Sequence, residues 1–369
     1  MRIFIFVTYE HRPRILKVNK NHPIEDSKQY DHTVYEMVYN SFNKFSFIRL
    51  LKNYCHRAPS KVHLSMSQTN KFNPIAGVFS AAITPLKADL SPDLDGMVSL
   101  LEFLARRGCH GALIMGTTGE GPSFSPEQRL NVYQAARQIR QAYPDFRLLA
   151  GTGTPSLEET IQLTCSAFEI GFDGVVVLPP YYFRKVNDSG LFDWFSLVIQ
   201  RSVPEGRWLL GYHIPDVSGV PFSIDLLSKL KDAFPDRFAG IKDSSGNKDF
   251  AQALGDRFGK NLIVLTGNDR LLSFALENHA AGCITACANL ISPKLRLVWD
   301  AYQGGQINPN DQEWIDQARQ NIERYPPLPS MIKALLAKRF GFPQWPVCPP
   351  LQPTPAENCL DVIEKLDIA

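Results

Sequence analysis

The stretch AGIKDSSG, residues 239–246, decides the fold that this sequence predicts. A short apolar run, 238–241, ends directly before Lys242, and a polar turn follows. Unbroken apolar runs are typical of strands in a parallel sheet, because both faces of such a sheet are covered. If the run is a strand, Lys242 lies at the sheet edge, where a desolvated amine can attack a carbonyl as a neutral nucleophile. The alternative is a solvated lysine in a surface ion pair.

The pattern of this stretch repeats on both sides of it. From Gly77 onward, short apolar runs alternate with segments of helical period, which indicates repeated βα units. The predicted strands are 78–83, 112–115, 148–150, 174–178, 208–211, 238–241, 262–265 and 283–286. Eight such units favour an α/β fold of the TIM (β/α)8 barrel type, and a doubly wound open sheet is the alternative.

Three regions of the chain differ in their sequence pattern. The barrel is predicted over residues 71–305, and amphipathic segments predict additional C-terminal helices over 306–369. Residues 1–70 mix basic and aromatic side chains without a steady period. We interpret them as a poorly structured N-terminal extension, or as upstream sequence included by a mistaken start, since Met66 would serve as a start. Neither a secretory signal nor a transit peptide fits their apolar and acidic residues.

The overall composition argues against several classes of protein. Hydrophobic residues make up 44% and charged residues 21%, as in an ordinary globular enzyme. A formal net charge of +2 gives no argument for nucleic acid or an anionic membrane as partner. No apolar run is long enough to span a bilayer. The seven cysteines are scattered without a set of metal ligands, which predicts buried thiols in the reducing cytoplasm.

Polar motifs follow the predicted strands at the end where barrel active sites form. The turn GTTGE, 116–120, offers backbone N–H groups and the hydroxyls of Thr117 and Thr118, which suit a carboxylate. By itself this turn is equally well a structural one. Tyr212 ends the strand before Lys242, so its phenol could reach the amine and move protons. The alternative for Tyr212 is a core residue whose hydroxyl has a structural partner.

Five motifs occur together in the order and spacing of one family. They are GTTGE (116–120), PYY (180–182), YHIP (212–215), GIK (240–242) and TGND (266–269). On these motifs the chain resembles the dihydrodipicolinate synthase/N-acetylneuraminate lyase family of Schiff-base aldolases. The resemblance extends from about residue 74 to the C-terminal helices, so it includes nearly everything except the extension.

This resemblance implies a set of catalytic residues. Lys242 would form an imine with pyruvate or another 2-oxo acid, and Tyr212 would shuttle protons, with Thr117 linking it to Tyr182. In many members the tyrosine that matches Tyr182 comes from a neighbouring subunit, so a homodimer or homotetramer is implied. The protonated imine is itself an electron sink, so neither a metal nor an organic cofactor is implied.

The resemblance also implies a set of substrate-binding residues. Thr117 and Thr118 would hold the carboxylate of the 2-oxo acid. Backbone groups at Gly267 and Ile284 would line the pyruvate pocket.

The aldehyde partner is less closely defined by the sequence. In the true synthases of the family, the segment after the catalytic tyrosine carries an arginine that binds the carboxylate of aspartate semialdehyde. Val217 stands at that place here and cannot form a bidentate pair. The lyase branch is therefore favoured, with a substrate such as a 2-keto-3-deoxy sugar acid. Arg184 and Lys185 are either ligands for a second acid group or solvated loop charges.

Three alternatives to this lyase or aldolase remain open at this point. The first is 4-hydroxy-tetrahydrodipicolinate synthase, which joins pyruvate to aspartate semialdehyde. The second is a dehydratase acting on a deoxy-sugar acid, because it uses the same imine. The third is a non-catalytic sensor of 2-oxo acids, although a sensor would not need the proton-relay groups.

Overall fold

In the computed structural model, residues 75–306 include eight parallel strands that close into a barrel. The structure describes residues 3–9, 12–18, 75–306 and 308–366. The strands are β3 (Gly77–Ala81), β4 (Gly111–Ile114), β5 (Arg147–Gly151), β6 (Gly174–Val177), β7 (Trp208–His213), β8 (Phe238–Asp243), β9 (Ile263–Thr266) and β10 (Gly282–Thr285). Because β10 pairs with both β9 and β3, the sheet has no free edge. The predicted TIM barrel is thereby confirmed, and the open-sheet alternative is wrong.

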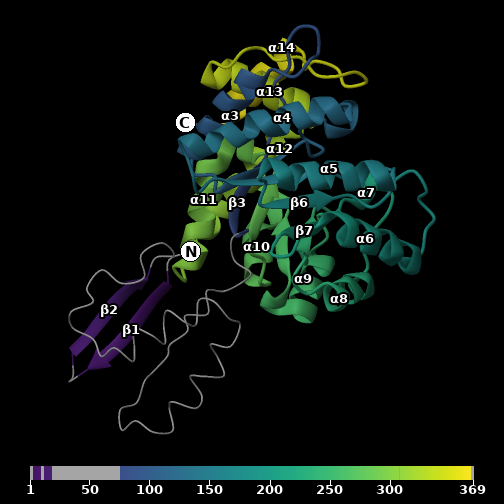
Figure 1. Ribbon diagram of the computed structural model, residues 1–369. Coiled ribbons are helices and arrows are strands. Elements are labelled where there is room, and N and C mark those ends of the chain that lie inside the picture. The colour runs from purple at the N-terminus through teal and green to yellow at the C-terminus, as the bar shows by residue number, and fades with distance from the viewer. Residues whose placement is uncertain (1–2, 10–11, 19–74, 307, 367–369) are drawn as a thin grey trace. The chain divides into compact units, whose positions relative to one another are not determined.

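Helices follow the strands and surround the barrel (Figure 1). They are α3 (Leu94–Arg106), α4 (Pro126–Arg137), α5 (Leu157–Ile170), α6 (Asp188–Ser202), α7 (Pro215–Ser218), α8 (Ile224–Ala233), α9 (Lys248–Phe258), α10 (Leu272–Glu277) and α11 (Ala288–Gln303). Side-chain caps fix several of the starts. At α4, Ser125 accepts from the backbone N–H of Gln128, whose side chain accepts from the backbone N–H of Ser125.

The apolar side chains of the barrel form two layers. An inner cluster fills the space enclosed by the strands and includes Phe79, Leu210 and Ile284. An outer cluster fills the space between strands and helices and includes Leu209 and Phe238. Since the interior is packed with side chains, polar groups that serve a substrate have to lie at the ends of the strands.

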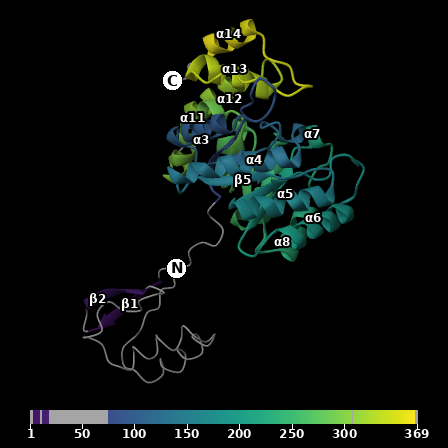
Figure 2. The ribbon, with the colours of Figure 1, turned by 45° about the horizontal axis from the view of Figure 1, so that its top comes forward.

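Additional helices follow the barrel, as the sequence predicts. They are α12 (Pro309–Ile322), α13 (Leu328–Phe340) and α14 (Ala356–Lys365). All three pack on one another, and α12 and α13 also pack on α11. Figures 1 and 2 both show them gathered on the side of the barrel that carries α3 and α11. Contacts within the chain join residues Phe72–Ala369 into one compact unit, and the boundary between 305 and 306 stays a prediction.

Part of the N-terminal region has regular structure. Strands β1 (Ile3–Tyr9) and β2 (Arg12–Val18) pair antiparallel, with Ile3 opposite Val18. Both strands fall within residues 1–70, and the interpretation of those residues as a poorly structured extension stays a prediction. The rest of the predicted extension, 19–70, lies outside the described residues, and its interpretation stays a prediction.

Candidate active site

Lys242 and Tyr212 stand side by side on neighbouring strands at the C-terminal end of the barrel. The register of β7 and β8 pairs Tyr212 with Lys242 directly. The Nζ atom of Lys242 lies 4.0 Å from the centroid of the Tyr212 ring. Both residues are buried, with exposed fractions of 3% and 4%. The predicted nucleophile is therefore an interior amine and not a solvated surface charge.

An irregularity in β8 turns Lys242 toward the interior. The register moves from Leu209 opposite Phe238 to Leu210 opposite Gly240, so Ala239 is an extra residue in β8. Strict alternation from Ala239, which belongs to the inner cluster, would point Lys242 outward. The bulge changes this alternation, and bulges beside active sites commonly redirect a side chain in this way.

Gly240 is required at this irregularity for a separate reason. A Cβ at Gly240 would overlap the carbonyl group of Ile263 on the neighbouring strand β9. The glycine lets the two backbones approach closely while Lys242 faces the barrel axis. The glycine of the motif GIK is thus required by the close approach of β8 and β9, which the sequence alone does not show.

The phenol of Tyr212 has a hydroxyl partner and a lowered pKa. Its oxygen lies 3.3 Å from Oγ1 of Thr117, and either atom can donate. Burial raises the pKa of Tyr212, but the charge of Lys242 and hydrogen bonds with Thr117, Lys242 and Ser244 lower that pKa by more. The net result is a pKa below the usual 10, so the phenol gives up its proton more readily than a free tyrosine.

Ser244 is a site residue that the motif analysis did not single out. Its hydroxyl is one of the groups that bind the Tyr212 phenol. Its side chain also fills the space beside Gly267, because a Cβ there would overlap Ser244 Oγ. Ser244 lies two residues after Lys242 in the stretch AGIKDSSG, and this nearness could have indicated it as a site residue.

The GTTGE turn follows β4 and brings Thr117 to Tyr212. The amide N–H of Glu120 donates to the carbonyl of Thr117 over 3.1 Å, which closes the turn. Gly119 packs against β3, where a Cβ would come within 2.8 Å of the carbonyl oxygen of Ala82. Thr117 and Thr118 are both half-buried. Hydroxyls in this position remain partly accessible to a ligand at the end of the barrel.

Gly267 and Ile284 come from the strands that complete the ring. Gly267 directly follows β9, and its N–H donates to the carbonyl of Asp243 over 2.6 Å, next to Lys242 in the chain. Ile284 lies on β10 and is fully buried in the inner cluster. The structure thus places both predicted pocket residues at the strands that neighbour β8 and β3.

Tyr182 is the predicted site residue that this chain does not bring to the others. It lies in the loop after β6 and is 76% exposed, while the neighbouring Phe183 is 72% exposed. The ring of Tyr182 packs edge-on against Phe183, with 5.2 Å between centroids. The predicted link from Thr117 to Tyr182 is not formed among the described residues of one chain.

Two further observations concern possible metal ligands and the histidine next to Tyr212. Within the part of the chain that the structure describes, no group of three or more His, Cys, Asp or Glu is arranged to bind a metal ion. Burial lowers the pKa of His213, beside Tyr212, to about 4, while the charge of Asp216 acts in the opposite direction. His213 accepts a hydrogen bond from the N–H of Phe222 at Nδ1 over 2.9 Å, so it is a structural neighbour of the site and not an acid.

Comparison with known proteins identifies the family. Residues 74–368 match the sequence profile of the dihydrodipicolinate synthetase family. The chain belongs to this family. It is therefore an enzyme, a lyase or aldolase of the Schiff-base type, and the resemblance seen in the five motifs is confirmed. None of the helices among the described residues has the length and apolarity needed to cross a membrane.

Individual relatives support the same assignment. An uncharacterized DapA-like lyase of Chloroflexus aurantiacus is 36% identical over 233 residues, which make up 63% of this chain and 76% of the relative. A 4-hydroxy-tetrahydrodipicolinate synthase of Methanosphaerula palustris is 32% identical over 232 residues, 62% of this chain and 77% of the relative. Among solved structures, the E. coli K12 prophage protein YagE in complex with pyruvate has a TM-score of 0.73 and 25% identity, covering 80% of this chain and 99% of YagE.

Proposed function

We propose that Lys242 is the imine-forming residue of this lyase and that its substrate is pyruvate or a related 2-oxo acid. The observation that carries the proposal is the buried pair of Lys242 and Tyr212, in register on β7 and β8. An amine held beside a phenol at the end of a barrel strand has next to it a group that can take up or give a proton while the amine attacks a carbonyl. The pyruvate found in the YagE complex agrees with this substrate class.

The chemistry follows from the positions of these groups. The amine of Lys242 attacks the keto carbon, and the carbinolamine loses water to give a protonated imine. Tyr212 gives the proton that the departing hydroxyl needs and later accepts one, while its contact with Thr117 holds the phenol in place. Loss of a C3 proton gives an enamine, which attacks the aldehyde and forms the new carbon–carbon bond. In the reverse direction, the bond between C3 and C4 breaks and the electrons return to the imine.

The carboxylate of the 2-oxo acid would bind at the GTTGE turn. The hydroxyls of Thr117 and Thr118 and the backbone N–H groups there are uncharged donors that suit an anion. Gly267 and Ile284 would close the pocket from the opposite strands. This arrangement would place the keto carbon between the turn and Lys242.

A homodimer or homotetramer would complete the proton relay. Tyr182 and Phe183 are 76% and 72% exposed, an uncommon exposure for two adjacent aromatic side chains. We propose that Tyr182 serves the site of a neighbouring copy of this chain. We also propose a cytoplasmic location, since the six described cysteines are all free thiols, as is usual in a reducing compartment.

For the aldehyde partner, we propose a molecule with its own acid group, bound by Arg184. Val217, where the synthases carry arginine, is 57% exposed and cannot pair with a carboxylate. The side chain of Arg184 lies across Gly219, two residues further on, where a Cβ would come within 2.6 Å of its Cδ. None of the described carboxylates lies within 4.0 Å of Arg184. The cation therefore stands beside the segment that would select the aldehyde.

Trapping with pyruvate and borohydride, read by intact mass, tests the imine. The wild-type chain should gain one reduced pyruvate adduct, and Lys242→Ala should gain none. Lys248→Ala, which removes an exposed lysine at the start of α9, is the matched control and should keep the adduct. An adduct that persists in Lys242→Ala would show that another amine reacts.

A screen of aldehydes in the presence of pyruvate tests the acceptor proposal. Acidic aldehydes should be preferred over glyceraldehyde, and Arg184→Met should raise the KM of the acidic acceptor roughly tenfold or more, as expected for losing one charge-assisted pair. Lys185→Met is the matched control on the same loop. Equal effects of the two substitutions would assign both charges to the solvated loop surface.

A further inference from the structure

Two buried ion pairs connect loops of the candidate site to the helices that follow the barrel. Nζ of Lys333 on α13 lies 2.6 Å from Oε1 of Glu120, the last residue of the GTTGE turn. Nη1 of Arg319 on α12 lies 2.7 Å from Oδ2 of Asp269, two residues after Gly267. Lys333 and Glu120 are almost completely buried, and so is Asp269. Each pair therefore ties one binding loop to the C-terminal helices.

The Glu120 pair fixes the turn through both carboxylate oxygens. Its Oε2 accepts from the N–H of Cys348 over 2.7 Å, while Lys333 also donates to the carbonyl of Pro346 over 2.6 Å. Glu120 has a left-handed backbone, with φ of 57°, and its N–H closes the turn by binding the carbonyl of Thr117. Glu120 thus connects the turn that contains Thr117 to α13 and to Cys348.

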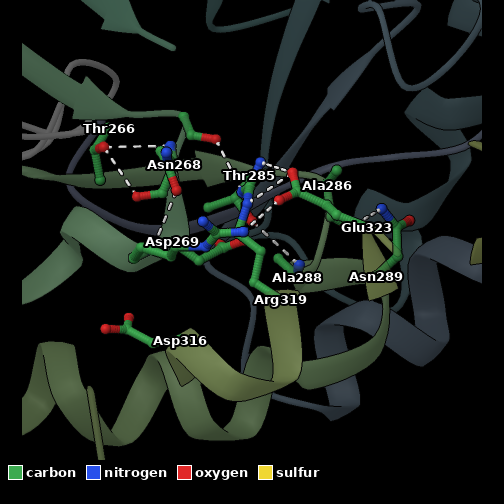
Figure 3. A network of polar contacts seen from close by, with 12 residues as sticks. Thr266, Asn268, Asp269, Thr285, Ala286, Ala288, Asn289, Asp316, Arg319 and Glu323 are labelled. Atoms are coloured by element: carbon green, nitrogen blue, oxygen red, sulfur yellow. Dashed lines mark hydrogen bonds and ion pairs between the residues drawn. The ribbon is translucent and has the colours of Figure 1, made fainter. Parts of the chain in front are cut away.

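The Asp269 pair fixes the loop after β9 in a similar way (Figure 3). Arg319 also donates to the carbonyl of Gly267 over 3.5 Å and to Glu323 over 2.6 Å. The side-chain amide of Gln312 donates to the backbone carbonyl of Asp269 over 2.9 Å. Groups of α12 thus bind both ends of the short segment that begins with Gly267.

We propose that Lys333 and Arg319 are positioning residues for the 2-oxo acid, which they serve by fixing the two loops that face Lys242. The inference rests on the proposed function, because it takes Thr117, Thr118 and Gly267 as substrate contacts. A buried ion pair stabilises a fold no better than well-packed apolar side chains do, but its geometry is specific. Small errors in the position of a binding group weaken a site strongly. The C-terminal helices would accordingly be part of the site machinery.

The test measures the pyruvate concentration that gives half-maximal borohydride trapping, which requires no knowledge of the aldehyde. Lys333→Met should raise this concentration about tenfold or more and should also lower the melting temperature. In the double variant Glu120→Gln/Lys333→Met no buried charge is left unpaired, so most of the melting temperature should return. The raised half-saturating concentration should remain, because the turn has lost its anchor.

Arg319→Lys provides a second, milder test on the other loop. Lysine keeps the charge but lacks the planar group that reaches Asp269, Gly267 and Glu323 together. This variant should fold and still need more pyruvate for half-maximal trapping. Arg201→Met is the matched control, because it breaks an exposed pair with Glu158 between α5 and α6 and should leave trapping unchanged.

The outcomes separate this inference from the proposed function. If pyruvate affinity recovers together with the melting temperature in the double variant, the Lys333 pair is purely structural and the inference is wrong for that loop. If Arg319→Lys needs no more pyruvate than the wild type for half-maximal trapping, the inference is wrong for the loop that contains Gly267 and Asp269. Absence of an adduct in the wild-type chain would instead refute the proposed function itself.

Discussion

Removing the hydroxyl of Tyr212 should slow turnover strongly and still leave formation of the imine measurable. Tyr212→Phe keeps the ring, whose centroid lies 4.0 Å from Nζ of Lys242, and removes the oxygen that lies 3.3 Å from Thr117. A positioned acid or base contributes roughly 10²–10⁴ in rate, which corresponds to about 3–5 kcal/mol of transition-state stabilisation. We therefore expect the rate to fall by about a hundredfold or more.

Exchange of the methyl protons of pyruvate in heavy water, followed by NMR, is a suitable assay. It needs only the imine and the enamine, so it does not depend on the unknown aldehyde. Tyr212→Phe should exchange these protons slowly and yet form the borohydride adduct at high pyruvate concentration. Loss of exchange together with an intact adduct would assign Tyr212 to proton transfer.

Tyr133→Phe is the matched control for this experiment. Tyr133 is fully buried on α4, and its hydroxyl donates to the carbonyl of Gly151 over 2.8 Å. Removing it should cost about 1 kcal/mol of stability but leave exchange near the wild-type rate. If the exchange rate of Tyr212→Phe lies within about threefold of the wild-type rate, instead of about a hundredfold below it, Tyr212 is not the acid or base. An equal loss in both variants would point to a folding defect.

Two further substitutions test features around the site. Burial lowers the pKa of His213 to about 4, so protonation favours the unfolded chain and the free energy of unfolding should fall by up to about 3 kcal/mol as pH drops from 6.5 to 4. His213→Asn can still accept the hydrogen bond from the N–H of Phe222, and its free energy of unfolding, measured in urea, should not show this decrease at low pH. If the pH dependence is the same as in the wild type, His213 is not its cause. Gly240→Ala should abolish the pyruvate adduct or the fold, because its Cβ overlaps the carbonyl of Ile263. Gly190→Ala, where the nearest contact of a Cβ is at 3.5 Å, should change neither. If Gly240→Ala folds and forms the adduct, β9 can move to make room for the Cβ.

The fold could be predicted because the strands are continuous apolar runs, and such runs are typical of parallel strands that are covered on both faces. Strand β8 is predicted at 238–241 and extends to Asp243 in the structure. Helix α11 begins at Ala288 and is interrupted at Ile291, whose φ and ψ of −116° and 21° are not helical. Pro293 lies in the first turn after this interruption, where proline is tolerated because its missing N–H has no partner in the helix.

The finer parts of the site could not be predicted from local sequence. The bulge at Ala239 is a property of pairing with β7, so the sequence of β8 alone gives no sign that Lys242 turns inward. Glu120 and Lys333 are 213 residues apart, and their pairing depends on where α13 packs. For Tyr182, the family resemblance implies a role in the site of a neighbouring subunit, and this stays a prediction.

The closure of the barrel by β10 and β3 has a consequence for how the enzyme is made. Cys283 pairs with Val78, so the ring cannot close until β10, the last of its eight strands, has been synthesised. Lys242, on β8, is synthesised before that point. The site that we propose around Lys242 is therefore complete only after β10 has joined β3.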